Sequence, residues 1–341
     1  MPKDLFSTLK ADPSPYPRLR MTSENKGINM TKPKVTVVGA GFVGATTAQR
    51  IVEKEIADVV LIDIVEGMPQ GKALDMMESA PVEGFKTKIT GTNNYADTAN
   101  SDVVVVTAGI ARKPGMSRDD LVNTNAGIVG GVITEAVKYS PNAIFVIVSN
   151  PLDVMTYLAW KKSGLPSTRV FGMAGELDSA RMAYFIAEAL NCNPSDVQAM
   201  VLGGHGDEMV PVPQHTKVKG KSITELLPAD KIEAINQRTR EGGAEIVKYL
   251  KTGSAYYAPS ASVVRMVRAI LEDKGEVIAS CVYMTGQYGL KDVYCGVPAK
   301  LGRKGVVEIV ELPLTDKQKQ ELATSAQHVR ENCEKVTLVS K

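Results

Sequence analysis

Three residues in the second half of the chain have the types and spacing that acid–base chemistry needs. His205 lies between glycines in the stretch GGHGDEMVPV and is one of three histidines in the chain. Asp178 and Arg181, in ELDSARM, are three positions apart, so they share one face of a helix predicted over 176–190. A histidine can take the proton from a substrate hydroxyl near neutral pH, and a carboxylate on its other ring nitrogen would hold the tautomer. An arginine beside them would bind a carboxylate through two parallel hydrogen bonds.

A basic loop follows a strongly apolar run in the first half of the chain. The stretch GIARKPGMSR, residues 109–118, places Arg112, Lys113 and Arg118 around a Pro-Gly turn, directly after DVVVVTA. An arginine on this loop could bind a substrate carboxylate through two parallel hydrogen bonds. Each of these features has an ordinary alternative: a surface histidine, a surface ion pair and a solvated loop. Their occurrence together, behind a dinucleotide-binding pattern, favours a functional site.

That pattern is VVGAGFVG, which holds Gly39, Gly41 and Gly44 in G-x-G-x-x-G spacing after a strand-like run. Such glycines allow a tight turn, close approach of the backbone to a pyrophosphate, and a helix whose free N–H groups face the phosphates. Asp63 ends the next apolar run, 24 residues after Gly39. A carboxylate there accepts ribose hydroxyls and repels a 2′-phosphate, so the sequence predicts NAD rather than NADP. The alternative is a plain strand–turn–helix with a surface aspartate.

The elements that must position these residues alternate along the chain. Runs rich in Val and Ile, with little alternation of polar residues, indicate parallel strands covered on both faces, over 34–38, 58–63, 101–109 and 142–151. After about Phe171 the pattern changes to longer helices, polar turns and further strand-like runs, with helices over 229–251 and 255–273 and a last helix from Thr315. We predict an α/β fold class: an N-terminal Rossmann dinucleotide-binding domain with a parallel sheet, followed by an α+β catalytic domain.

Length and composition agree with two domains. The chain has 341 residues and a formal net charge of +2, which is too balanced to favour nucleic acid or an anionic membrane as the main partner. The four cysteines have no metal-ligand spacing, so we predict no metal site, and reduced thiols are typical of a cytoplasmic protein. No apolar run is long enough to span a membrane. We expect a flexible extension over 1–32, a NAD-binding domain over 33–173 and a catalytic and substrate domain over 174–339.

With these motifs in view, the sequence resembles the lactate/malate dehydrogenase superfamily, and most closely its lactate-dehydrogenase-like malate dehydrogenases of bacteria. The resemblance runs from about Lys34 to the last helix and leaves out the N-terminal extension. It implies reversible oxidation of (S)-malate to oxaloacetate by NAD⁺, as in the tricarboxylic acid cycle. The stretches that carry it are GAGFVG, DIVEGMPQGKALDM, RKPGMSRDDL, SNPLDVMTY, LDSAR, GGHGDEMVP and GSAYYAPSAS.

The resemblance also implies a role for each site residue. His205 would accept the proton, with Asp178 as its orienting partner, and Arg181 would hold the carboxylate next to the reacting carbon. Arg118 would polarise the carbonyl of the keto acid, and Asn150 would touch both substrate and nicotinamide ribose. Cofactor contacts are implied for Gly39, Ala40, Gly41, Phe42, Val43, Gly44, Asp63, Asn125, Val148, Ser149 and Asn150.

Arg112 occupies the position that separates malate from lactate enzymes in this family, where lactate enzymes usually carry Gln. With pyruvate bound and the loop closed, its guanidinium would lack a partner in a dry site, which typically costs about 3–5 kcal/mol. Three alternatives are weighed against this one: a lactate or other 2-hydroxyacid dehydrogenase, an NAD-dependent glycoside hydrolase, and a non-enzymatic NAD sensor. A glycoside hydrolase of that kind needs a metal, usually held by Cys and His, and this chain has no Cys beside His205. A non-enzymatic sensor would tend to lose the His, Asp and Arg set, which is present here. We expect a homotetramer, with a dimer as the alternative assembly.

Overall fold

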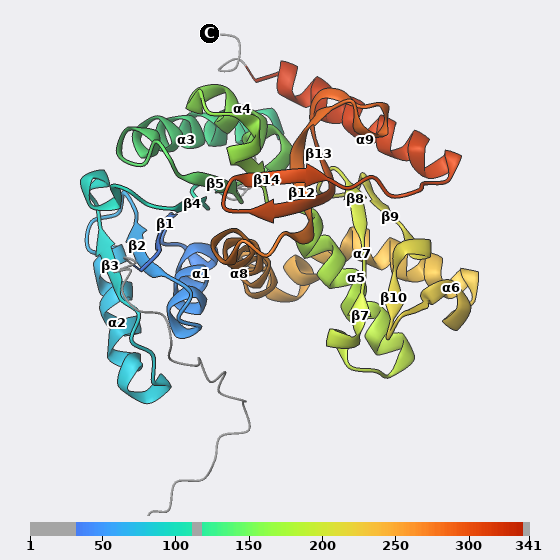
Figure 1. Ribbon diagram of the computed structural model, residues 1–341, viewed down its shortest axis with the longest axis horizontal. Coiled ribbons are helices and arrows are strands. Elements are labelled where there is room, and N and C mark those ends of the chain that lie inside the picture. Colours follow the sequence, from blue (N-terminus) through green and yellow to red (C-terminus); the bar gives the residue numbers. More distant parts are fainter. Residues whose placement is uncertain (1–31, 111–117, 337–341) are drawn as a thin grey trace, which may run out of the picture. The chain divides into compact units, whose positions relative to one another are not determined.

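A mixed sheet of nine strands forms the centre of the structure, a computed structural model that describes residues 32–110 and 118–336. The predicted extension over 1–32, apart from Lys32, lies outside the described residues. From Pro33 onward the chain belongs to one compact unit. The strand order is β14-β13-β12-β6-β5-β4-β1-β2-β3 (Figure 1).

The first six strands of this sheet are parallel, as predicted. Their central members are fully apolar and buried, since helices cover both of their faces. The bounds are β1 Lys34–Val38, β2 Asp58–Ile62, β3 Ile89–Thr92, β4 Val103–Val106, β5 Ile144–Ile147 and β6 Val170–Gly172.

The last three strands extend the same sheet in the antiparallel sense. They are β12 Glu276–Thr285, β13 Lys291–Gly302 and β14 Gly305–Ile309. β12 meets β6 where Cys281 lies opposite Gly172. The sequence did not indicate β6, whose three residues are too short for a recognisable pattern, nor this joining of the two halves. The parallel sheet and the mixed second half are confirmed; the continuous sheet is an addition that only the structure shows.

Helices pack on both faces of the sheet. α1 and α8 contact each other on one side, and α3 and α4 contact each other on the other, while α9 runs along β13 (Figure 1). The bounds are α1 Phe42–Glu53, α2 Met68–Glu83, α3 Arg118–Tyr139, α4 Leu152–Ser163, α5 Gly175–Leu190, α6 Ile223–Leu226, α7 Ala229–Leu250, α8 Tyr257–Glu272 and α9 Asp316–Glu334. The last helix begins with a capping box, in which Thr315 and Gln318 each accept the other's backbone N–H.

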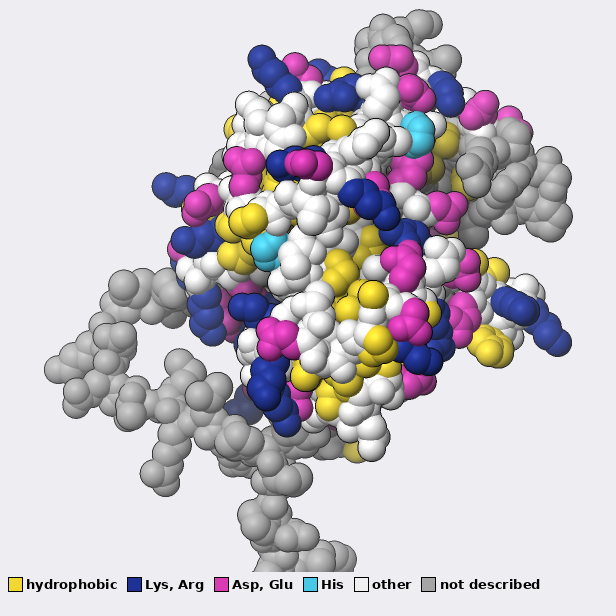
Figure 2. Space-filling model, turned by 90° about the vertical axis from the view of Figure 1, so that its right-hand side faces the viewer, with side chains coloured by type: hydrophobic (Ala, Val, Ile, Leu, Met, Phe, Trp, Pro, Cys, Tyr) yellow, Lys and Arg dark blue, Asp and Glu magenta, His cyan; other side chains and the backbone are white. Residues whose placement is uncertain are grey.

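Two small sheets complete the second half. β8 Val201–Gly203 pairs with β9 Met209–Pro211, and the turn between them holds His205. The other sheet consists of β7 Val197–Gln198, β10 Lys217–Val218 and β11 Lys221–Ser222. On the face drawn in Figure 2, basic and acidic side chains are interspersed, in keeping with the balanced charge.

Candidate active site

The glycine turn between β1 and α1 has the geometry that the sequence pattern predicts. Gly39 has φ +102°, and a Cβ there would lie 2.7 Å from Thr107 Oγ1. A Cβ on Gly44 would lie 1.8 Å from the Gly39 carbonyl oxygen, so only glycine lets the helix pack this closely. Gly41, just before α1, has no atom within 4 Å of its Cβ position. The backbone at the helix N-terminus is therefore uncrowded, as the close approach of a pyrophosphate requires.

Asp63 follows β2 directly and is bound to the glycine turn. Its Oδ2 accepts the Ala40 backbone N–H at 2.6 Å, and its Oδ1 accepts the Val65 N–H at 2.9 Å. Lys72 Nζ donates to the Ala40 carbonyl at 2.6 Å. Each carboxylate oxygen has a further lone pair, which leaves capacity for ribose hydroxyls. Besides the ribose contact predicted for it, Asp63 therefore holds the backbone of the glycine turn in position.

The side chain of Asn125, in α3, reaches the loops that follow the neighbouring strands β4 and β5. The Asn125 side chain is buried; its Oδ1 accepts the Ile110 N–H at 2.8 Å, and its Nδ2 donates to the Asn150 carbonyl at 2.7 Å. Ser149 Oγ donates to the Ala108 carbonyl at 2.5 Å. These contacts join the loop after β4 to the loop after β5. Asn125 holds the backbone here, and its cofactor contact stays a prediction.

His205 and Asp178 come together from different elements. Asp178 lies in the first turn of α5 and is 2% exposed, whereas His205 lies in the β8–β9 turn. Their Nδ1 and Oδ2 atoms are 3.0 Å apart. An ionised carboxylate can only accept, so Nδ1 carries the proton and Nε2 is left free to receive one. Burial alone would lower the pKa of His205, but the nearby Asp178 carboxylate, with help from Asp153, raises it above its ordinary value.

Arg181 lies one helical turn after Asp178, and its NH1 is 3.3 Å from Asp178 Oδ1. Its Nε is buried and has no hydrogen-bond partner among the described residues. Burial lowers the pKa of Arg181, and the Asp178 charge opposes that shift. α7 packs against this side chain through Gly242 and Gly243. A largely buried guanidinium with unused donor capacity suits an incoming carboxylate.

A cavity of about 520 Å³ opens beside His205, and neither Asp178 nor Arg181 lines it. It brings together Asn150 and His205, which the sequence had singled out, with Asp119 of α3 on its wall. Arg112 lies outside the described residues. α3 begins at Arg118, whose side chain the structure does not describe.

The sequence did not predict that Asp153 and Ser325 contact the turn that carries His205. Asp153 Oδ2 accepts the His205 backbone N–H at 3.0 Å, and Ser325 Oγ accepts the Gly204 N–H at 2.8 Å. These partners are 52 and 121 residues apart in the chain, so no local pattern marks them. Asp153 in the first turn of α4 reads like an ordinary acidic residue at a helix start.

Within residues 32–110 and 118–336, no cluster of three or more His, Cys, Asp or Glu side chains could hold a metal ion. In the same ranges, no helix combines the length and apolar character that crossing a membrane requires.

The comparisons with known proteins agree with this geometry. Residues 33–172 match the family model of the lactate/malate dehydrogenase NAD binding domain, and residues 175–339 match that of its alpha/beta C-terminal domain. The chain belongs to the lactate/malate dehydrogenase family, a family of oxidoreductases, and its cofactor is NAD.

Individual malate and lactate dehydrogenases are similar to this chain over most of its length. The malate dehydrogenase of Chloroherpeton thalassium is 59% identical over 304 residues, which cover 89% of this chain and 98% of the relative. That of Methanosarcina mazei is 54% identical over 305 residues, 89% of this chain and 99% of the relative. The solved malate dehydrogenase of Salinibacter ruber is 49% identical with a TM-score of 0.85, over 89% and 97% of the two chains. The lactate dehydrogenase of Cryptosporidium parvum, complexed with lactic acid and NAD, is 42% identical with a TM-score of 0.86, over 89% and 98%.

Proposed function

We propose that the protein is an NAD-dependent malate dehydrogenase that interconverts (S)-malate and oxaloacetate. The observation that carries the chemistry is the contact of 3.0 Å between His205 Nδ1 and the buried Asp178 carboxylate, with Arg181 on the same helix. The choice of malate rests on the high identity to relatives of that name. It rests also on Arg112 in the loop.

His205 and Asp178 divide the proton transfer between them. During malate oxidation, Nε2 of His205 takes the proton of the substrate hydroxyl, and the Asp178 carboxylate stabilises the resulting imidazolium. In the reverse direction the same imidazolium donates the proton to the carbonyl oxygen of oxaloacetate. Arg181 binds the carboxylate next to the reacting carbon through its unused donors. Arg118 is assigned the polarisation of the carbonyl.

The cofactor residues are assigned from the glycine turn and the strand ends. When bound, NAD⁺ would supply the hydride acceptor for the oxidation. The turn and the α1 N-terminus would hold the pyrophosphate, and Asp63 the adenosine ribose. Asn150 and its neighbours would border the nicotinamide. The full set is Gly39, Ala40, Gly41, Phe42, Val43, Gly44, Asp63, Asn125, Val148, Ser149 and Asn150. We assign cofactor binding to residues 33–173 and the remaining chemistry to residues 174–339.

A lactate dehydrogenase is the second candidate, because the Cryptosporidium parvum enzyme matches as well in backbone as the malate enzymes do. The shared fold therefore does not separate the two substrates. We assign the choice to Arg112, which would pair with the second carboxylate of oxaloacetate.

One assay separates the candidates: oxidation of NADH followed at 340 nm with oxaloacetate or with pyruvate. A malate dehydrogenase gives a kcat/KM for oxaloacetate at least about 100-fold above that for pyruvate, since an unpaired buried charge costs several kcal/mol. Equal values, or a preference for pyruvate, would overturn the proposal.

Localisation, pathway and assembly are part of the same proposal. We infer a cytoplasmic enzyme of the tricarboxylic acid cycle that assembles as a homotetramer. Light scattering on the purified protein tests the assembly: about four times the chain mass of 36.6 kDa supports it, and twice that mass supports the dimer.

A further inference from the structure

Asp153 is a buried carboxylate that the proposed proton transfer does not use. It lies in the first turn of α4 and is 7% exposed. Its Oδ2 accepts the His205 backbone N–H at 3.0 Å, and its Oδ1 accepts the Cys281 thiol at 3.1 Å. Neither partner is a cation, and burial raises the pKa of Asp153. A buried carboxylate without a cationic partner destabilises the fold when it is ionised. Its presence beside His205 therefore suggests a functional role.

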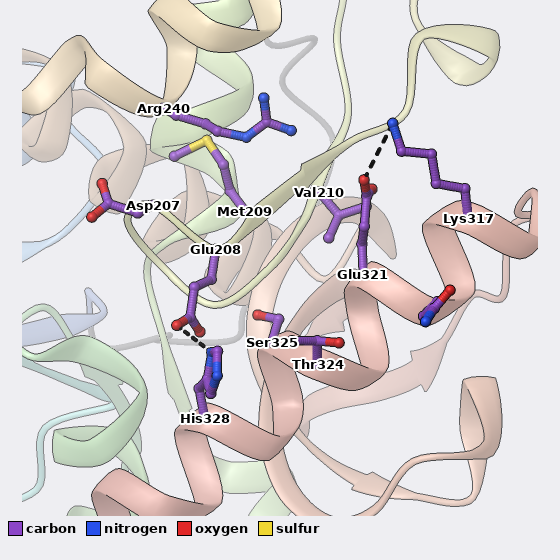
Figure 3. Close-up of a pocket in the computed structure, with 11 residues that line it drawn as sticks. Asp207, Glu208, Met209, Val210, Arg240, Lys317, Glu321, Thr324, Ser325 and His328 are labelled. Carbon is purple, nitrogen blue, oxygen red and sulfur yellow. Dashed lines mark ion pairs between the residues drawn. The ribbon is translucent and has the colours of Figure 1, made fainter.

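The turn that carries His205 is held from two sides. Gly204 donates its N–H to Ser325 of α9, and the next residue, His205, donates its N–H to Asp153 of α4. A Cβ on Gly204 would lie 3.2 Å from Ser325 Oγ and 3.5 Å from Asp153 Oδ2, so little free space remains here. Figure 3 shows Glu208, which belongs to the same turn, pointing toward His328 of α9; their Oε1 and Nδ1 atoms are 2.5 Å apart.

Several charged groups face His205 or its cavity. Asp178 contacts the imidazole directly, and Arg181 opposes it with a positive charge. Asp153 adds a second negative charge from α4. The remaining charged residues that line the cavity are Asp119, Asp207, Glu208 and Lys335. Asp153 differs from these four because it is buried and bonded to the histidine's own backbone.

We propose that Asp153 is a positioning residue of this site: its ionised carboxylate anchors the His205 turn and stabilises the imidazolium together with Asp178. This inference rests on the proposed function, in which His205 alternates between neutral and protonated forms. Two carboxylates then flank one histidine, Asp178 at the ring and Asp153 at the backbone. The Cys281 thiol serves as the second donor that keeps the Asp153 carboxylate hydrogen-bonded.

The test is Asp153→Asn, which removes the charge but keeps an oxygen for the His205 N–H. The chain has only three histidines, so histidine-selective ¹³C labelling of the full, untagged protein gives three titration curves by NMR. We expect the pKa of His205 to fall by about one unit, the size of effect that a nearby opposite charge produces. His215, which contacts the Pro313 carbonyl, serves as an internal standard, because its curve should be the same in wild type and Asp153→Asn. An unmoved His205 curve overturns the proposal.

Matched variants separate charge from general disturbance. Glu176→Gln neutralises a second buried carboxylate, 8% exposed and paired with Arg265, and should leave His205 unchanged. Ser325→Ala loosens the same turn without removing a charge, so it should lower kcat without shifting the pH profile. Asp153→Ser also removes the charge and serves if the Asn variant does not fold. A shift of His205 in the Glu176 or Ser325 variant as large as in Asp153→Asn also overturns the proposal.

Kinetics give the second readout. Oxaloacetate reduction needs protonated His205, so the alkaline limb of its kcat/KM profile should move down in pH by the same amount in Asp153→Asn. A constant limb beside a shifted NMR curve overturns the link to turnover. The NMR titration is made without substrate, so it stays informative if the protein does not reduce oxaloacetate. In that case the proposed function fails while the placement of Asp153 is still tested.

Discussion

Gly242 of α7 offers a sharp test of how Arg181 is held. Two adjacent glycines inside a helix of 22 residues are unfavourable, at about 1 kcal/mol each relative to alanine. They face the Arg181 side chain. A Cβ on Gly242 would lie 3.1 Å from Arg181 Cδ, whereas a Cβ on Gly243 would lie 3.6 Å from NH2, an ordinary contact. The first position therefore limits where Arg181 can lie, and the second does not.

In Gly242→Ala, Arg181 must shift by a few tenths of an ångström. A misplacement of 1 Å can cost about 100-fold in rate, so a shift of this size predicts a loss of about 3- to 10-fold in kcat/KM. The loss should fall mainly on the KM for oxaloacetate, because Arg181 is assigned to substrate binding. The KM for NADH should stay constant. The gain in helix propensity and the cost of crowding oppose each other, so the free energy of unfolding should stay within about 1 kcal/mol of the wild type.

Steady-state kinetics of oxaloacetate reduction and thermal unfolding check both parts. Gly131→Ala in α3 is the control, since Gly131 is an exposed helical glycine with no atom within 4 Å of its Cβ position. It should raise stability by up to about 1 kcal/mol and leave the KM unchanged. Gly243→Ala should behave like the control. If Gly242→Ala gains stability with an unchanged KM, then either α7 does not constrain Arg181 or Arg181 does not bind substrate.

Four further predictions concern specificity and pH. Arg112→Gln should lower the preference for oxaloacetate over pyruvate by about two to three and a half decades in kcat/KM; a ratio that barely moves contradicts the assignment. Asp63→Ser should reduce the selectivity for NAD over NADP, measured as the ratio of kcat/KM, and unaltered selectivity would refute that role. Asp178→Asn should lower kcat about 10²- to 10⁴-fold and move the alkaline limb of oxaloacetate reduction to lower pH, because Asp178 raises the pKa of His205. Since the folded pKa of His205 is raised, the pair's stabilisation is fully present below about pH 6.5 and is lost as pH rises through the folded pKa. Thermal unfolding of wild type and Asp178→Asn at pH 6 and 9 checks this sign: a difference that grows with pH contradicts it.

The features that the sequence predicted are those with a local cause. The run at β1, the glycines after it and the acidic residue after β2 lie within 30 residues, and their types dictate a strand, a turn and a helix start. The apolar runs at β4 and β5 predict buried strands in the same local way. β6 was missed because its three residues are too few to show a period. The joining of β12 to β6 has no local signal, because it depends on how the two halves pack.

The sequence by itself determined which side chains can do chemistry: a glycine-flanked His205, the Asp178 and Arg181 pair, and a dinucleotide turn. Residue type and helical spacing suffice for this, since both are properties of neighbours in the chain. Only the tertiary structure decided that His205 Nδ1 lies 3.0 Å from Asp178, that Arg181 keeps a buried donor unpaired, and that Asp153 holds the histidine's backbone. Those contacts join residues up to 52 positions apart, and packing, not local preference, selects them.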